Sequence, residues 1–263
     1  MEPESLFGLA LGITPPWYVK AAEFSVERGR LDLYLDFQRG VCFPCPSCGA
    51  EGAKPYDTSE DTWRHLNFFQ HGTYLHARVP RVQCPQGCGV KRVEVTWARP
   101  DSGFTQLFEA YLMILMREMP VATAAGMVGE HDTRLWRVLH YYVGQARAQE
   151  DFSDVQKVGV DETSSRRGHR YITVFADLQR AKVIFATEGK DLPVVAAFKR
   201  DLESHKGRAE NVQEVCCDMS PAFTAGFEEF FPSAQLTFDR FHVTRILQRR
   251  SGPGTPRRAT RAP

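Results

Sequence analysis

Two short cysteine pairs constrain this chain more than any other feature of its sequence. Each pair is Cys-Pro, one or two further residues and then Cys-Gly: Cys45 with Cys48, and Cys84 with Cys88. Close pairs on tight turns supply two thiolates each to a tetrahedral Zn²⁺, and the following glycine lets the turn take a positive φ. We therefore predict one structural zinc on these four cysteines. Four separate buried thiols are the alternative.

The setting of the cysteines favours metal over disulfides. Residues 1–11 contain no Lys or Arg, and the chain has no run of 18 apolar residues. We therefore expect no secretory signal, no transmembrane helix and a reducing, intracellular compartment. The 35 residues between the pairs exceed the usual spacing of such sites. Cys42 can replace a ligand, although we expect a spare thiol, and Cys216 and Cys217 lie in an apolar run and are expected to be structural.

Changes in composition divide the chain into four parts. Residues 1–99 are Cys-rich with short alternating runs, 100–150 have helical periodicity, and 151–248 alternate strand and helix patterns. Residues 249–263 hold five arginines, no acid and almost no large apolar side chain, so we expect a disordered basic tail. The predicted fold class is multidomain α+β. The net charge of +1 becomes −4 without the tail, so any nucleic-acid contact of the body must come from local patches.

Short runs within these parts predict individual elements. Strands are expected at 31–37, 73–82, 91–97, 155–160, 171–178, 182–187, 212–217 and 234–241, and helices at 192–204 and 221–231. The third part thus alternates apolar strands with helices, which is typical of an α/β domain.

The helical middle matches a helix-turn-helix. An apolar stripe from Phe104 to Leu115 is followed by Pro120, a short helix at 121–128, a turn and a longer helix at 133–148. The outward face of that last helix offers side chains that can contact phosphates and base edges, namely Arg134, Arg137, Tyr141 and Gln145. An ordinary three-helix unit with a solvated polar face is the alternative.

Carboxylates follow two apolar strands of the third part. Asp161 ends the run at 158–160, and Asp218 ends another run 57 residues later. Carboxylates at the ends of neighbouring strands can hold Mg²⁺ for phosphodiester chemistry. They can also be turn formers, and Asp218 can cap the helix that starts near Pro221.

Several motifs together resemble the transposases of bacterial insertion sequences of the ISL-three family. The stretches that carry the resemblance are Trp63-Arg64-His65-Leu66, residues 76–82, Val160-Asp161-Glu162-Thr163, residues 168–171, Cys217-Asp218-Met219-Ser220 and residues 238–243. The resemblance covers about residues 5–248. It implies a zinc ribbon, a DNA-binding helix-turn-helix and a ribonuclease-H-like domain with an Asp-Asp-Glu metal triad. Asp161 matches the first Asp and Asp218 the second, both as Mg²⁺ ligands, while Asp239 and His242 match a family segment that follows a later strand.

The resemblance also implies what the protein does. The expected partner is DNA, at the terminal inverted repeats of the element, with a homo-oligomeric protein located in the bacterial cytoplasm at the nucleoid. The Glu of the triad lies beyond the segment at 238–243, and the sequence ends at Pro263. We therefore expect a C-terminally truncated, catalytically inactive copy with an incomplete ribonuclease-H-like domain. Apolar residues such as Phe175 and Phe185, or their neighbours, should then be exposed on an uncovered sheet face. A non-catalytic zinc-containing regulator of transposition and a non-functional remnant are the alternatives.

Overall fold

The computed structural model of the protein describes residues 2–166, 170–240 and 244. The chain forms two compact units, residues 1–142 and 143–263. None of the described helices is long and apolar enough to span a bilayer. The predicted disordered tail at 249–263, the strand end at Phe241 and the motif residue His242 lie outside the described residues.

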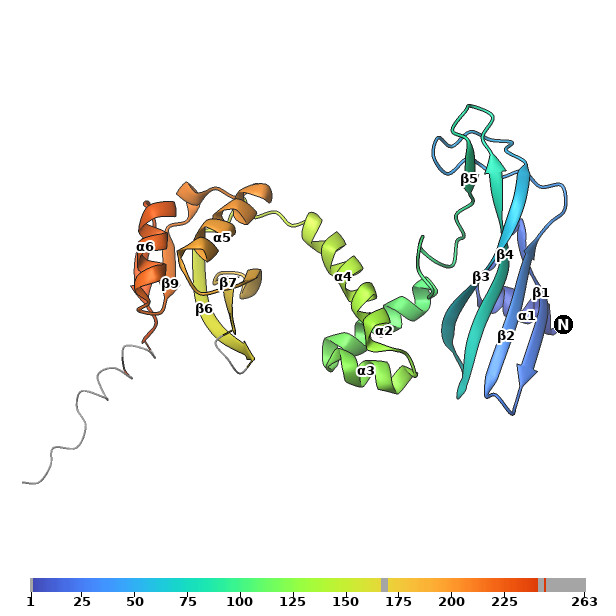
Figure 1. The fold of residues 1–263 in the computed structure, drawn as a ribbon, viewed down its shortest axis with the longest axis horizontal. Coiled ribbons are helices and arrows are strands. Elements are labelled where there is room, and N and C mark those ends of the chain that lie inside the picture. The colour runs from blue at the N-terminus through green and yellow to red at the C-terminus, as the bar shows by residue number, and fades with distance from the viewer. Residues whose placement is uncertain (1, 167–169, 241–243, 245–263) are drawn as a thin grey trace, which may run out of the picture. The chain divides into compact units, whose positions relative to one another are not determined.

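The first unit begins with a mixed sheet of five strands (Figure 1). A short helix, α1 (Pro3–Ala10), precedes the strands, which are β1 (Trp17–Ser25), β2 (Arg30–Phe37), β3 (Pro55–Phe68), β4 (His71–Gln83) and β5 (Val90–Arg92). The strand order is β1-β2-β4-β3, and β5 pairs with β4. The predicted strand at 91–97 is therefore wrong in length, because regular pairing stops at Arg92. Val93 and Trp97 instead turn into the core that includes Trp17 and Trp63.

Three helices complete this unit: α2 (Gln106–Glu118), α3 (Val121–Val128) and α4 (Asp132–Ala148), whose last residues belong to the second unit. Their own core includes Phe108, Leu112, Ala124 and Leu135. Leu66 of β3 packs against this core, and the backbone of Arg64 bonds to Gly103 and Thr105. The helices are therefore fastened to the sheet by backbone as well as by side chains.

The second unit has the strand arrangement of a ribonuclease-H-like sheet. Its strands are β6 (Lys157–Arg166), β7 (Arg170–Asp177), β8 (Lys182–Glu188), β9 (Glu214–Cys217) and β10 (Gln235–Phe238), in the order β10-β9-β6-β7-β8. The pairs β6–β9 and β9–β10 are parallel, and β7 is antiparallel to both neighbours. Its helices are α5 (Leu192–Ser204), the 3-10 turn η1 (Ala209–Asn211) and α6 (Pro221–Phe230). The expected α+β class is confirmed.

The helices α5 and α6 pack on one face of this sheet, and that face buries Phe175. The prediction that Phe175 is exposed is wrong: its ring is fully buried and stacks on Phe198 of α5, with centroids 4.3 Å apart. Phe185 packs at the margin of the same core, so it too is covered. The opposite face carries exposed apolar side chains, of which Val183 is one. Along this face the register pairs Val183 with Ala176, and Ala176 with Gly159. Alternating strands with apolar residues on both faces do not reveal from sequence which face the helices cover.

Candidate functional site

The four cysteines meet in one place, although 35 residues separate the pairs. Cys45 and Cys48 lie in the connection from β2 to β3, and Cys84 and Cys88 in the connection from β4 to β5. Figure 1 shows both connections at the same end of the sheet. Their Sγ atoms all lie within 4.8 Å of one another, and Cys48 Sγ is 3.6 Å from Cys84 Sγ. Zn–S bonds of about 2.3 Å in a tetrahedron place sulfurs about 3.8 Å apart. The donor set and spacing therefore fit Zn²⁺.

The backbone around the thiols is already shaped for a metal. Gly49 and Gly89 have φ of 71° and 78°, a conformation that favours glycine, and the amide of Gln86 donates to Cys84 Sγ at 3.3 Å. Hydrogen bonds, first from the backbone of Cys88, lower the pKa of the Cys84 thiol to about 6. Contacts with Cys48 and then Cys84 raise the pKa of the Cys88 thiol to about 12. Thiols this close do not all ionise without a cation, and a bound Zn²⁺ supplies that charge. Cys42 is exposed and stands outside the cluster.

The ends of the helices in the helix-turn-helix are fixed by local capping contacts. Thr105 caps α2 by accepting a bond from the amide of Phe108 at 3.3 Å. Pro120 precedes α3, and Gly129 ends α3 in the left-handed conformation with φ of 69°. The chain can therefore turn at once into α4, where the sequence predicts the recognition helix.

The four predicted DNA-contacting residues of α4 differ in their surroundings. Arg137, Tyr141 and Gln145 are exposed. Arg134 is half-buried: it pairs with Glu130, donates to the carbonyl of Gly103 at 3.3 Å and lies over the ring of Phe104 at 4.1 Å. Arg134 therefore already holds the turn, whereas Arg137 and Gln145 remain available to a partner. Tyr141 is exposed as well, although Arg99 lies over its ring at 4.1 Å.

Two buried carboxylates that the sequence analysis did not single out hold these helices in place. Glu109 of α2 is fully buried and accepts bonds from Arg99 at 2.9 Å, Ser102 at 2.6 Å and Tyr142 at 2.8 Å. Burial and then the Glu109 carboxylate raise the pKa of Tyr142 to about 12. The network joins α2, α4 and the segment that precedes α2.

Glu130, in the turn before α4, lies between Arg134 and the buried Arg64 of β3. The Arg64 guanidinium also donates to the Thr73 carbonyl at 3.0 Å, and burial lowers the pKa of Arg64. Arg64 belongs to one of the motifs that carry the family resemblance. Its place in that motif was the one sequence feature that pointed to this residue.

Asp218 and Asp239 directly follow the parallel strands β9 and β10, whereas Asp161 lies within β6. The prediction that this strand ends at residue 160 is wrong, because β6 pairs with β7 as far as Arg166. The register pairs Gly159 with Cys216 and Phe238 with Cys217, so continuing it sets Asp161, Asp218 and Asp239 side by side. Asp161 Oδ1 accepts a bond from the amide of Glu162 at 2.8 Å, and Asp218 Oδ1 accepts one from Ser220 at 2.9 Å. Burial first, then the charge of Asp218, raises the pKa of Glu162. Within the described residues, however, the cysteine cluster is the only group of three or more metal-type ligands that converges.

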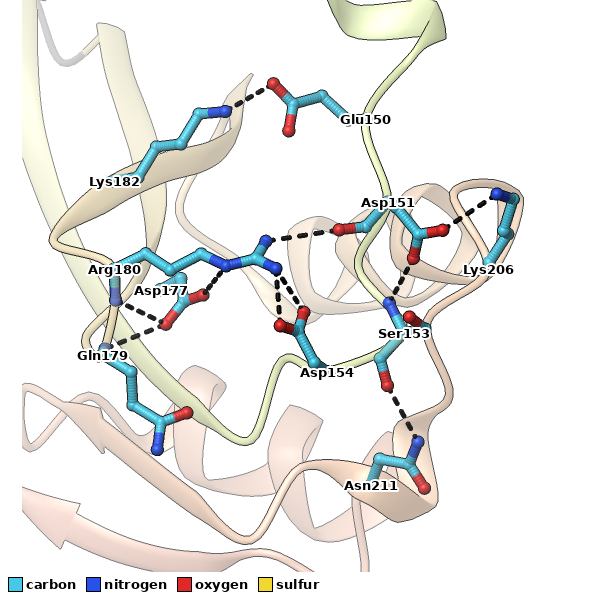
Figure 2. A network of polar contacts seen from close by, with 10 residues as sticks. All are labelled: Glu150, Asp151, Ser153, Asp154, Asp177, Gln179, Arg180, Lys182, Lys206 and Asn211. Atoms are coloured by element: carbon cyan, nitrogen blue, oxygen red, sulfur yellow. Dashed lines mark hydrogen bonds and ion pairs between the residues drawn. The ribbon is translucent and has the colours of Figure 1, made fainter.

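A network of ion pairs fixes the segment that leads into this sheet, as Figure 2 shows. Arg180, in the β7–β8 turn, donates to the Asp151 carbonyl at 3.2 Å and to both oxygens of Asp154 at 2.5 and 2.6 Å. Its Nε lies 3.6 Å from the buried carboxylate of Asp177. Lys206 bonds to the Asp151 side chain at 2.8 Å and lowers the pKa of that carboxyl. The start of the second unit is thus anchored to its own sheet.

Comparison with known proteins assigns the three parts. A model of the zinc-finger of transposases IS204/IS1001/IS1096/IS1165 matches residues 43–88, a model of the helix-turn-helix domain of transposase family ISL3 matches 93–143, and a transposase model matches 158–251. The zinc-finger, helix-turn-helix and DDE transposase models thus follow one another along the chain. The chain belongs to the ISL3 family, and the predicted zinc is its structural metal.

Individual relatives agree with the family. The transposases for insertion sequence element IS1557 of two Mycobacterium tuberculosis strains, CDC 1551 / Oshkosh and H37Rv, are each 30% identical over 254 residues, or 92% of this chain. The transposase for IS1001 of Bordetella parapertussis is 28% identical over 239 residues. The chain spans 55% and 57% of the lengths of these relatives. A solved retroviral intasome complex matches with a TM-score of 0.26 and 15% identity, too low to define a shared fold.

Proposed function

We propose that the chain binds the terminal inverted repeats of its own insertion sequence through α4. The exposed side chains Arg137, Tyr141 and Gln145 on a helix held by Glu109 and Glu130 carry this proposal. A rigid helix with an exposed polar face can enter the major groove and read base edges there. We also propose a division into domains: residues 1–99 for zinc binding, 100–150 for DNA binding and 151–248 for catalysis, followed by the basic tail at 249–263.

The second unit is proposed to supply the catalytic carboxylates of the complete enzyme. Asp161 and Asp218 would hold Mg²⁺, because the parallel register of β6 and β9 sets the two residues side by side in one sheet. Bound Mg²⁺ supplies activation of water, and then of a DNA 3′ hydroxyl, for in-line attack on a phosphodiester. The carboxylates contribute by fixing where the scissile phosphate can sit.

This copy is proposed to be catalytically inactive. Two carboxylates without a third leave the cations incompletely coordinated. Asp239 lies beside Asp218 in the strand register, but within the described residues these carboxylates do not converge as a group of three metal ligands. A non-catalytic regulator that occupies element ends is the second candidate, favoured by the intact zinc and helix-turn-helix parts. A non-functional remnant is the third.

One experiment separates these three functions. The chain is incubated with an end-labelled duplex of the element terminus and Mg²⁺ or Mn²⁺, then examined by footprinting and for strand nicking. We expect protection of the terminus without nicking. Nicking that disappears in Asp161→Ala would refute the proposed inactivity. Absence of any footprint would leave the non-functional remnant as the remaining candidate.

Two further experiments test the expected assembly and location. We propose that the protein is a homo-oligomer, which light scattering of the same binding reaction tests. We also propose a nucleoid location, which imaging in cells tests.

A further inference from the structure

A small open cavity lies beside the recognition helix and shares Arg134 and Arg137 with the predicted DNA-contacting residues. It measures about 60 Å³ and is lined by the segment at 99–104 and the first half of α4. Three arginines are among the residues that line it: Arg99, Arg134 and Arg137. Since a cavity needs about 10–15 Å³ of space open to a water-sized probe to hold one water molecule, this one has room for the two non-bridging oxygens of a phosphate group.

Two of the three arginines are held rigidly by their own carboxylates. Glu109, fully buried, holds Arg99 at 2.9 Å, and the Arg99 guanidinium lies over the Tyr141 ring at 4.1 Å. Glu130 holds Arg134 in the same way. An arginine has five N–H donors, so each retains donors beyond those its carboxylate uses. Fixing the side chains beforehand removes the entropy cost of ordering them when a ligand binds.

Gly103 makes room for this arrangement. A Cβ at Gly103 would come within 2.7 Å of an Arg134 guanidinium nitrogen, while the Gly103 carbonyl accepts a bond from Arg134 at 3.3 Å. The loop therefore approaches the arginine closely because position 103 has no side chain.

Arg137 supplies the charge that is not already matched. Within the described part of the chain, no hydrogen bond or ion pair is recorded for its exposed guanidinium. Asp101, on the same cavity, is exposed and opposes an incoming anion. The site thus has one free cation, two pre-oriented cations and one repelling carboxylate.

We propose that this cavity binds one backbone phosphate of duplex DNA and so sets how α4 enters the groove. The proposal rests on the DNA binding proposed above and deepens it. Arg99 and Arg134 act as positioned donors, and Arg137 closes on the phosphate. A phosphate rather than a base edge is favoured because the donors converge on a small concavity beside a loop, and because charged donors in a fork match phosphate oxygens.

The test compares charge variants of the full chain on two duplexes, the element terminus and an arbitrary sequence. Arg137→Ala should weaken binding about tenfold on both, and should reduce the slope of log affinity against log salt by about 1. Asp101→Asn should tighten binding about two- to threefold; asparagine tolerates the positive φ of 58° at this position. Arg117→Ala removes the same charge from an exposed site on α2, where Arg117 pairs with Glu118, and should leave affinity unchanged.

Each outcome decides between phosphate and base. Loss at Arg137 on the terminus alone, with an unchanged salt slope, indicates base readout and overturns the phosphate site. Equal losses in Arg137→Ala and Arg117→Ala indicate a general charge effect and overturn it as well. If the unaltered chain binds neither duplex, the DNA-binding function itself fails, which is a distinct result. Circular dichroism and zinc content of each variant confirm that the fold is intact.

Discussion

Removing the charge of Glu109 should loosen the recognition helix without touching its exposed face. The carboxylate is fully buried and accepts three bonds, from Arg99, Ser102 and Tyr142. Glu109→Gln keeps the shape but leaves Arg99, largely buried, without its counter-charge. Losing one partner of a buried ion pair costs about 3–5 kcal/mol, and one charged hydrogen bond is worth about 1.5–3 kcal/mol. Since Gln still accepts one bond, we expect a loss of about 2–4 kcal/mol.

Native-state hydrogen exchange is the assay, because it reports the opening free energy of each helix separately. Amides of α2 and α4 should lose protection by the same amount, while those of α5 and α6 should not change. Tyr142→Phe, which removes one neutral donor, should cost only about 1 kcal/mol. Glu118→Gln, at an exposed position of α2, is the matched control and should have no effect. Unchanged protection in Glu109→Gln would refute the role of the buried carboxylate.

Three further predictions follow from single contacts. Metal analysis should find about one zinc per chain, lost in Cys45→Ser but retained in Cys42→Ser, because only the first thiol lies in the cluster; retention in both would contradict the assignment. Phe198→Ala should destabilise the second unit by about 3–5 kcal/mol in denaturant titration, because the ring is fully buried; a loss below about 1 kcal/mol would show that the core is loosely packed. Burial and then the charge of the neighbouring arginine lower the pKa of His65 from 6.5 to about 4. The unfolded chain therefore binds more protons between those values, so stability should fall as pH drops from 6.5 to about 4. His65→Gln should flatten that part of the profile, and an unchanged profile would contradict the burial of this imidazole.

The helix-turn-helix could be predicted because its signals are local. Pro120 and Gly129 mark the ends of helices through backbone conformation alone, and the predicted helix at 121–128 matches α3. The zinc ligands were equally accessible, because a Cys-Pro and Cys-Gly pair encodes its own turn.

Other parts depend on contacts that sequence does not display. The edge strand β3 was missed because residues in its first half, such as Thr58 and Glu60, are polar and exposed, without the alternation that marks a half-buried strand. The buried carboxylates of Glu109 and Glu130 were missed for a related reason. Acidic residues are usually exposed, and only the three-dimensional position of their arginine partners reveals that these two are not.

The affinity of the full chain for its element terminus, against a shuffled duplex of the same composition, tests the central claim most directly. Fluorescence anisotropy at physiological salt should give a preference of at least about tenfold for the terminus, because base readout adds to the phosphate term that both duplexes share. Removing zinc with a chelator should abolish that preference, since the sheet that holds the cysteines also anchors the turn before α4 through Arg64. Equal affinity for both duplexes, with or without zinc, would contradict the account.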